Sequence, residues 1–357
     1  MDYHVVWYLL VGILLIGYAI LDGFDLGVGA LHLLSKTDHD RRIMLNSIGP
    51  VWDGNEVWLI TAGGALFAAF PEVYATAFSS FYLALMFVLV ALIFRAVSIE
   101  FRSKEENTTW RKTWDFNFFI GSVIAAVVFG VAIGNIIMGI EIGPDKEYHG
   151  TFLALFTPYT LMTGVFNLVM FTMHGGVYLL IKTEGKLQAD MKRYTMNAYF
   201  VFVTLFVVLT GMTLYLKPEM LANFSFGKVA ATNPQHHLIK DYQTFVSVFA
   251  WLVIGLNVLS IMNIPRTIVK GKYHQAFISS SCTIAALIML FALGVFPNLV
   301  VANDPANSLN IYNSASSEYT LETMFKVAIF GMPFVGIYTS LIYWTYKGKT
   351  KIDDQSY

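Results

Sequence analysis

Nine apolar runs follow one another along the chain, and short polar connections separate them. A helix that crosses a bilayer needs about 20 predominantly apolar residues, and every run reaches this length. The two-residue alternation of membrane-spanning strands is absent from the runs. We therefore predict an all-α polytopic membrane protein with nine transmembrane helices, at residues 6–34, 50–70, 77–98, 114–140, 159–181, 194–217, 243–263, 276–297 and 322–346.

The basic residues of the connections predict the orientation of these helices. Of the 23 lysines and arginines, 18 lie in the connections after helices one, three, five and seven and in the C-terminal tail, all on one side. Because an excess of Lys and Arg marks cytoplasmic loops, the N-terminus is predicted outside and the C-terminus inside. Two polar outside connections, 218–242 and 298–321, are expected to be surface loops suited to packing on a partner. The five basic residues on the outside are Lys146, Lys217, Lys228, Lys240 and Lys326.

The composition agrees with a membrane protein and excludes several other classes. Of the 357 residues, 56% are apolar and 13% are charged, whereas soluble domains have a charged fraction of roughly 25%. The net charge of −1 provides no basic surface for nucleic acid. With one cysteine, Cys282, the chain forms neither an internal disulfide nor a zinc site built on paired cysteines.

The whole chain, 1–357, is predicted to form a single integral membrane domain that carries a faint internal repeat. The first and fifth helices both end on a Leu-Leu pair, then Lys-Thr and an acidic residue, and the fourth and eighth helices both open on Phe-Ile. This echo suggests a duplicated unit, although common membrane-exit patterns are the alternative explanation. The predicted units are a first four-helix unit, 1–140, a second four-helix unit, 159–297, and the ninth helix, 322–346.

Two carboxylates inside the first predicted helix are the most informative residues for function. Asp22 and Asp25 lie one turn apart and therefore share a face of the helix. An ionisable residue inside a membrane costs roughly 2.5–3.5 kcal/mol on insertion scales, so each needs a reason. We interpret the pair as a proton relay or ion site, or else as a hydrogen-bonding clamp to a helix that approaches closely at Gly23 and Gly27.

The start of the second predicted helix carries further acids. Asp53, Asn55 and Glu56 stand between Trp52 and Trp58, at the predicted inner face. A carboxylate in the first turn caps a helix and complements its dipole, and this is the alternative to a functional role for Asp53. The set is larger than a cap requires, so we favour a functional role.

For three further charged residues near the inner face we expect structural roles or exposure to solvent. Capping is favoured for Asp115, which follows Trp114 at the start of the fourth predicted helix. Glu100 and Arg102, at the end of the third, are expected to be solvated.

The chain alone is not expected to bind haem. Axial ligation at membrane depth takes His, Met or Cys, and of the eight histidines only His174 lies well inside a predicted span. We interpret His174 as a hydrogen-bonded interior residue, so no metal site is predicted. The sequence also lacks a phosphate-binding glycine loop, a nucleophile elbow and an HExxH motif, so no catalytic residue is predicted in this chain.

Polar motifs in the first 120 or so residues resemble those of subunit II of the cytochrome bd quinol oxidases. The resemblance extends over the whole chain and includes the number of spans. The motifs that carry it are Asp22–Gly27 (DGFDLG), Trp52–Leu59 (WDGNEVWL), Thr61–Ala68 (TAGGALFA), and Phe94–Arg95 followed by Phe101–Lys104 (FRSK).

The resemblance implies one subunit of a terminal oxidase complex. Subunit II of the family carries no haem and supports a larger subunit I, which holds two b-type haems, one d-type haem and the quinol-binding loop. The complex oxidises quinol and reduces O₂ to water with protons from the cytoplasm. A structural quinone, bound lipid and a small single-helix accessory subunit are further expected partners. The implied location is the cytoplasmic (inner) membrane of a bacterial or archaeal cell.

The resemblance also implies roles for individual residues. Asp53 corresponds to an acid on a cytoplasmic proton path, and Trp58 to a tryptophan near a lateral entry for O₂. Asp25 and Asp115 match further acids of the family. Together with the acids found above, the predicted proton pathway comprises Asp53, Asp25, Glu56, Asp22 and Asp115.

A proton- or cation-coupled secondary transporter is the alternative function, and a structural membrane scaffold is a third. Buried acids, glycine-rich helices and an internal repeat also suit a transporter. Against it, the sequence shows no pair of spans broken at matching positions. An absorption spectrum of the purified complex separates these functions, because only an oxidase carries haem.

Overall fold

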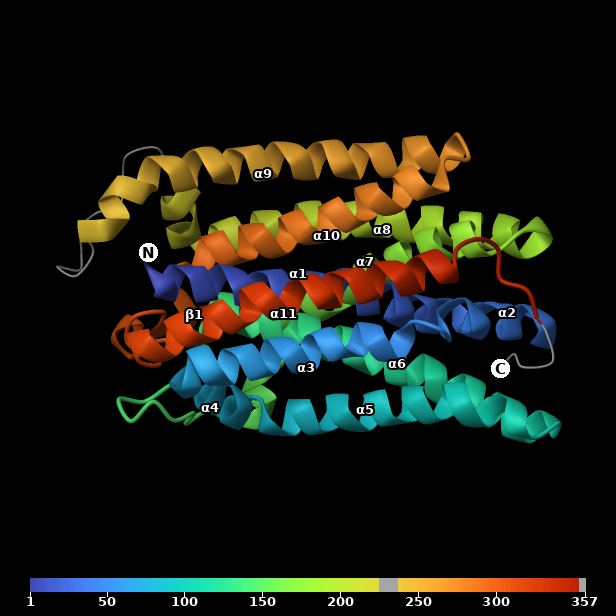
Figure 1. Cartoon of the computed structure of the whole chain (residues 1–357), viewed down its shortest axis with the longest axis horizontal. Coiled ribbons are helices and arrows are strands. Elements are labelled where there is room, and N and C mark those ends of the chain that lie inside the picture. The colour runs from blue at the N-terminus through green and yellow to red at the C-terminus, as the bar shows by residue number, and fades with distance from the viewer. Residues whose placement is uncertain (225–236, 353–357) are drawn as a thin grey trace.

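The chain folds into a bundle of long helices that lie side by side (Figure 1). The structure is a computed structural model, and it describes residues 1–224 and 237–352. Eight helices of the described residues are long and apolar enough to cross a membrane. The helices that run along the bundle are α1 (Tyr3–His32), α3 (Trp52–Ala69), α5 (Tyr82–Phe101), α6 (Thr108–Met138), α7 (Pro158–Lys182), α8 (Gly185–Leu216), α9 (His237–Val269), α10 (Tyr273–Val295) and α11 (Glu318–Thr345).

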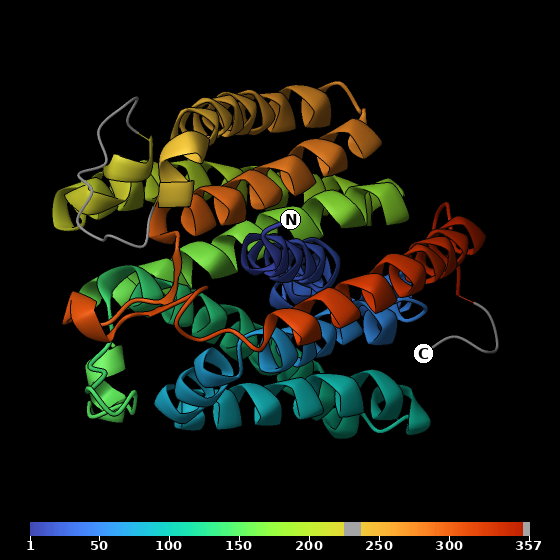
Figure 2. The same cartoon turned by 60° about the vertical axis from the view of Figure 1, so that its left-hand side comes forward.

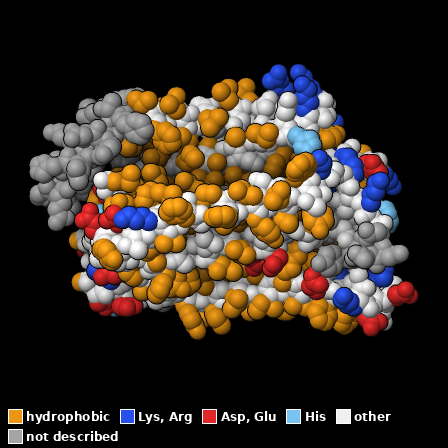
Figure 3. Space-filling model, in the orientation of Figure 1, with side chains coloured by type: hydrophobic (Ala, Val, Ile, Leu, Met, Phe, Trp, Pro, Cys, Tyr) orange, Lys and Arg blue, Asp and Glu red, His pale blue; other side chains and the backbone are white. Residues whose placement is uncertain are grey.

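Short elements close the two ends of the bundle. One end holds α2 (Asp38–Ile48) and the end of α11, and many Lys and Arg side chains gather there in Figure 3; we call it the basic end. At the opposite end, strands β1 and β2 pair antiparallel. The remaining short elements are α4 (Pro71–Ser80), η1 (Arg102–Lys104), η2 (Phe152–Leu155), η3 (Pro218–Phe224), β1 (Asn298–Val300), η4 (Pro305–Asn307) and β2 (Leu309–Asn310).

Helix α1 occupies the centre of the bundle. It packs against α3, α6, α7, α10 and α11, and Figure 2 shows it nearly end-on among the other helices. Its contact with α7 needs two glycines: a Cβ atom on Gly27 would overlap the backbone carbonyl of Phe171, and one on Gly175 would lie 2.5 Å from the carbonyl carbon of Gly27. Backbone therefore meets backbone at this crossing, which fixes where the acids of α1 are placed.

The second predicted span corresponds to α3, which is a helix but not one of the eight candidates. It has 18 residues and runs along α1 within the bundle. Its polar first turn and its glycines lower its hydropathy below that of the other long helices. The structure thus supports a polytopic helical membrane protein, while the count of nine spans and the orientation of the termini stay predictions.

The third predicted span, 77–98, was placed across a break between two helices. Helix α4 ends at Ser80 and α5 begins at Tyr82, with Phe81 between them outside the helical conformation. Helix α4 itself begins at Pro71, which suits a first helical position because it has no N–H to donate. Apolar side chains continue through the break, so hydropathy alone does not reveal it.

The connection at 298–321 packs on this chain instead of forming a free polar loop. Val300, Leu309 and Ile311 are each at most 1% exposed, in a hydrophobic cluster that closes this end of the bundle. In the other polar connection, 218–242, residues 225–236 lie outside the described residues and include Lys228, and the side chain of Lys240 is not described either. For that connection the expectation of a partner surface stays a prediction.

Some helix contacts recur in the two predicted four-helix units. In the unit 1–140, α6 packs on α5 and α1; in the unit 159–297, α10 packs on α9 and α7. Helices α1 and α7 open the two units and pack on each other. That the two units arose by duplication, with 322–346 as an additional ninth helix, stays a prediction.

The orientation can be tested with single cysteines at Thr108 and Asn303 in a Cys282→Ser background. Both positions are exposed, and they lie at opposite ends of the bundle. In intact cells, a membrane-impermeant maleimide should label the cysteine at position 303, whereas position 108 should react only after permeabilisation. The reverse pattern would overturn the predicted orientation.

Candidate functional site

A fully buried arginine gathers three carboxylates in the interior of the bundle. Arg95 of α5 donates to both carboxylate oxygens of Asp22 on α1, with a distance of 3.1 Å from Nη1 to Oδ2. Its Nη2 lies 3.8 Å from Oδ2 of Asp25, and its Nη1 lies 3.9 Å from Oε2 of Glu56 on α3. The side chains of Arg95, Asp22 and Asp25 are all 0% exposed. We call these four residues the acid cluster.

The acid cluster contains more negative than positive charge. Three carboxylates face one guanidinium, so the fully ionised cluster would have a net charge of −2. A buried excess of charge is costly in a low-dielectric interior and is relieved by bound protons or cations. The arrangement is therefore chemically suited to taking up and releasing protons.

A hydrogen-bond chain connects the acid cluster to α11. Asn55 Nδ2 donates to Oδ2 of Asp25 over 2.8 Å and to the carbonyl oxygen of Leu21 over 3.3 Å. The Tyr343 hydroxyl of α11 donates to Asn55 Oδ1 over 2.8 Å. Among the described residues, Asp25 Oδ1 and Arg95 Nε have no partner. Buried polar atoms of this kind are where ordered water binds in proteins.

Asp53 lies at the surface, one turn before Glu56 on α3. Its side chain is exposed and has no hydrogen bond or ion pair with any described residue. The capping alternative fails in its hydrogen-bonded form, because Val51 is the N-cap and α3 has no side-chain capping bond. Glu56 is 22% exposed and Asp25 is fully buried, so the three acids form a gradient from the surface into the cluster.

Asp115 belongs to a second, separate ion network near the basic end. It accepts from Arg102 Nε over 2.5 Å and from Arg41 Nη1 over 2.8 Å, and it contacts His32 Nε2 at 2.6 Å. Arg102 also donates to Asp38 over 2.7 Å. The side chains of Asp115, Arg102 and His32 are at most 1% exposed.

Two expectations about this network were therefore wrong. Asp115 does not cap α6, because α6 begins at Thr108 and its N-cap is Asn107, well before the acid. Arg102 is buried instead of solvated, because Asp115 and Asp38 surround its guanidinium. The helices extend further than the apolar runs, and this brings the residues between the runs into the bundle.

The two networks are separated by two helical turns. Arg95 and Arg102 lie seven residues apart along the chain, and so do Asp25 and His32. At 1.5 Å per residue this spacing corresponds to about 10 Å along a helix axis. The structure thus brings together Asp22, Asp25 and Glu56, places Asp53 beside them at the surface, and keeps Asp115 apart.

Trp58 packs against α1 and is partly exposed. A Cβ atom on Gly17 would lie within 2.6 Å of the Trp58 ring, so the glycine makes room for the indole. The indole thus lies at the contact between α3 and α1, and part of it is exposed at the surface of the bundle. A role in O₂ entry stays a prediction.

His174 is the hydrogen-bonded interior residue that the sequence predicts. It is fully buried, its Nδ1 lies 2.7 Å from Ser280 Oγ, and its Nε2 lies 3.0 Å from the carbonyl oxygen of Ile20. Because both ring nitrogens are occupied, His174 does not fit the role of an axial haem ligand.

Sequence reasoning missed the residue at the centre of the site. Arg95 had been counted with the basic residues of a connection, although it stands inside the apolar run 77–98. The rule applied to Asp22 and Asp25, that an intramembrane charge needs a reason, would have identified it. Tyr343 gave no comparable signal, because its partner Asn55 is 288 residues away.

Comparisons with known proteins agree over the whole chain. The family model described as cytochrome bd terminal oxidase subunit II matches residues 3–346. Cytochrome bd-I ubiquinol oxidase subunit 2 of Escherichia coli (strain K12) is 38% identical, over 99% of this chain and 97% of that protein. Cytochrome bd ubiquinol oxidase subunit 2 of Bacillus subtilis is 32% identical, over 93% and 92%. The solved bd oxidase structure from Geobacillus thermodenitrificans has the same fold, with a TM-score of 0.77 at 14% identity over 97% of this chain and 99% of that one.

Removing the guanidinium should destabilise the protein more than removing the whole ion pair. Arg95→Met leaves three carboxylates without their cation, and breaking a buried pair in this way costs about 3–5 kcal/mol. Arg95→Met combined with Asp22→Asn restores the net charge of the native cluster. We expect a lowered unfolding temperature in detergent for the single variant and recovery of at least half of the loss in the double variant.

Arg193→Met is the matched control, because Arg193 is 63% exposed and pairs with Asp190 only at the surface. It should leave the unfolding temperature unchanged. Equal losses in Arg95→Met and in the double variant would contradict the charge-balance argument.

Proposed function

The chain belongs to the cytochrome bd terminal oxidase subunit II family, and we propose that it is the haem-free subunit of a quinol oxidase complex that reduces O₂ to water. One observation carries the proposal beyond family membership. Three motif segments far apart in sequence, Asp22–Gly27, Trp52–Leu59 and Phe94–Arg95, each contribute a side chain to the acid cluster. The motifs that carry the family resemblance thus supply the buried acid cluster, and this supports a role in proton transfer.

Acids of α1 and α3 serve, in this proposal, as a proton path from the cytoplasm. Exposed Asp53 takes up protons near the basic end, Glu56 passes them inward, and Asp25 with Asp22 holds them beside Arg95. The gradient of burial along these acids supports that order. Asp115 is surrounded by cations in its own network, and this favours a structural role for it over proton transfer.

A haem-bearing subunit I covers, we propose, the exposed face of α3 after its first turn, and Asp53 stays accessible from the cytoplasm. This face carries Thr61 and Gly64, and an added Cβ atom on Gly64 would meet nothing within 4 Å. Small and polar residues suit close packing against another protein helix. Helix α11 is also largely exposed and extends this face, since it packs on α3.

The cofactors belong to the partner in this proposal. Two b-type haems and one d-type haem are assigned to subunit I, in keeping with the poor fit of His174 to axial ligation. Entry of O₂ beside Trp58, a structural quinone and a small single-helix accessory subunit remain further parts of the proposal. The location is the bacterial cytoplasmic membrane, with the N-terminus outside, since the relatives named above are bacterial proteins.

The transporter alternative finds no support in the comparisons, which match subunits of bd oxidases. A complex purified through a tag on this chain should contain a larger subunit and show both d-type and b-type absorption bands. A preparation without haem and without a larger partner would contradict the proposed function.

Substituting Asp53 tests the proton path. Asp53→Asn preserves the shape of the side chain and removes only its charge, and α3 has no side-chain capping bond to lose. Haem content should therefore hold, while quinol oxidase turnover falls at least tenfold, and at most by roughly the 10²–10⁴-fold that proton-transfer groups contribute. Turnover is measured as O₂ consumption, and charge movement is measured in proteoliposomes.

Two further variants complete this experiment. Asp53→Asn with Glu56→Gln covers the case in which Glu56 takes up protons directly, and it should be less active than Asp53→Asn. Asp190→Asn changes an exposed acid at the start of α8 and should retain full turnover. Full activity in the double variant would exclude the path.

A further inference from the structure

The hydrogen-bond chain from Tyr343 to Asp25 connects three helices. Tyr343 lies near the end of α11, Asn55 is 2% exposed on α3, and Asp25 is fully buried on α1. Both side-chain bonds have a length of 2.8 Å. These bonds join α11, a helix at the surface of the bundle, to the two carboxylates of the acid cluster that are 0% exposed.

Tyr343 determines which end of the Asn55 amide faces Asp25. An Asn side chain has a donating NH₂ and an accepting oxygen at opposite ends. The hydroxyl of Tyr343 donates to the oxygen, so the NH₂ is directed to Asp25 and to the carbonyl oxygen of Leu21. Without the hydroxyl, the amide oxygen loses its donor, and only the 3.3 Å bond from the NH₂ to Leu21 still favours the native orientation over one that presents the oxygen to Asp25. An amide oxygen facing Asp25 is tolerated only when the carboxyl carries a proton.

We propose that Tyr343 is a positioning residue for proton transfer: by orienting the Asn55 amide toward Asp25, it favours the state in which Asp25 has released its proton. The inference rests on the proposed role of the acid cluster in proton transfer. It adds a residue from α11, which lies outside all the motifs by which the sequence resembles the family.

Other ionisable side chains near Asp25 also influence its proton exchange, in addition to the hydrogen bond from Asn55. Asp22 lies on the same helix, Glu56 on α3 and Arg95 on α5. Tyr178 of α7 also faces this region and donates to the carbonyl oxygen of Ser47 over 2.7 Å. Tyr343→Phe leaves all of these groups in place, so a change in proton exchange would report on the amide.

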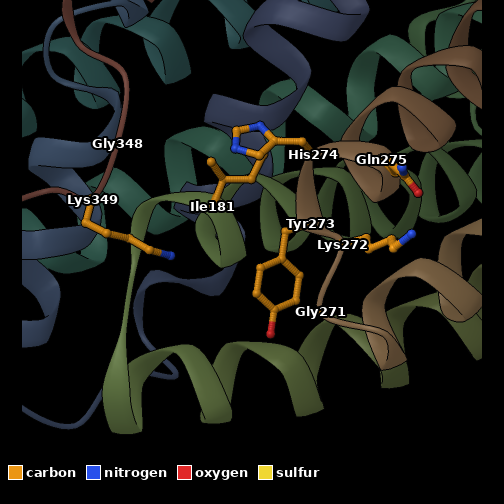
Figure 4. Close-up of a pocket in the computed structure, with 8 residues that line it drawn as sticks. All are labelled: Ile181, Gly271, Lys272, Tyr273, His274, Gln275, Gly348 and Lys349. Atoms are coloured by element: carbon orange, nitrogen blue, oxygen red, sulfur yellow. The ribbon is translucent and has the colours of Figure 1, made fainter.

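A purely mechanical role for Tyr343 is the competing explanation, and other bonds already serve that role. The tail after α11 is attached to α7 by Lys349, whose Nζ donates to the carbonyl oxygens of Leu180 and Thr183 over 3.2 and 2.7 Å. Figure 4 shows Lys349 pointing from this tail toward Ile181, across a surface pocket of about 430 Å³. The attachment of α11 therefore does not depend on the Tyr343 hydroxyl alone.

The test uses the complete oxidase complex with Tyr343→Phe and, as control, Tyr215→Phe near the end of α8, where the tyrosine is 85% exposed. In Tyr343→Phe we expect unchanged haem content, a several-fold lower maximal turnover, and an alkaline midpoint of the pH–turnover profile raised by about one pH unit, the scale of one hydrogen bond to a charged group. The control should match the native complex. A normally assembled Tyr343→Phe complex with the native midpoint would overturn the proposal.

Two more variants separate the possible failures. If Asp25→Asn keeps the native turnover and pH profile, the proposed proton role of the acid cluster itself is wrong. If Asp25→Asn has a lower turnover but Tyr343→Phe keeps the native midpoint of the pH–turnover profile, only the positioning role of Tyr343 is wrong. If Tyr343→Phe does not assemble, 3-fluorotyrosine at position 343 retains the packing and donates more strongly. Its midpoint should move to lower pH, and a native midpoint there would also overturn the proposal.

Discussion

The ion pair between Arg95 and Asp22 joins α5 to α1 at a depth where neither charge reaches solvent. Removing two such ions from water costs several kcal/mol each, and their attraction offsets this cost only in good geometry. The two-pronged contact provides that geometry and leaves the guanidinium close to Asp25 and Glu56 as well. Without this one cation, three carboxylates would lie close together with no opposing charge, so the charge balance of the acid cluster depends on it.

The helices were largely predictable because a membrane-spanning helix needs about 20 predominantly apolar residues, and such a stretch is easily recognised in the sequence. This signal is an average over the stretch, so it is insensitive to local irregularity. The same averaging hid the break at Phe81, where the chain is apolar on both sides. Helix α3 illustrates the opposite case, since it lies where the sequence predicts a helix but is more polar than a typical span. Its polarity has a local origin, namely the residues that contact the acid cluster and the face exposed beside them.

The acids of the site were predictable for a related reason: a carboxylate inside an apolar run is rare and needs an explanation. What joins them was not predictable, because it depends on tertiary contacts. Arg95 stands inside a predicted span and could be flagged by the same rule, but its three partners on α1 and α3 could not be predicted, and Asp115 moves from a cap to an ion network once α6 is known to begin at Thr108. The contact between Tyr343 and Asn55 leaves no trace in either local sequence.

The positions of Arg95 on α5 and Arg102 directly after its end also have a mechanical consequence. Their buried carboxylate partners lie on two different helices, Asp22 on α1 and Asp115 on α6. A one-turn slide of α5, about 5.4 Å, or a rotation about its axis would strip both guanidinium groups of their partners simultaneously. Sliding of α5 along its axis would therefore leave two buried cations without partners at once, and the free-energy cost of that loss disfavours piston-like movement of this helix.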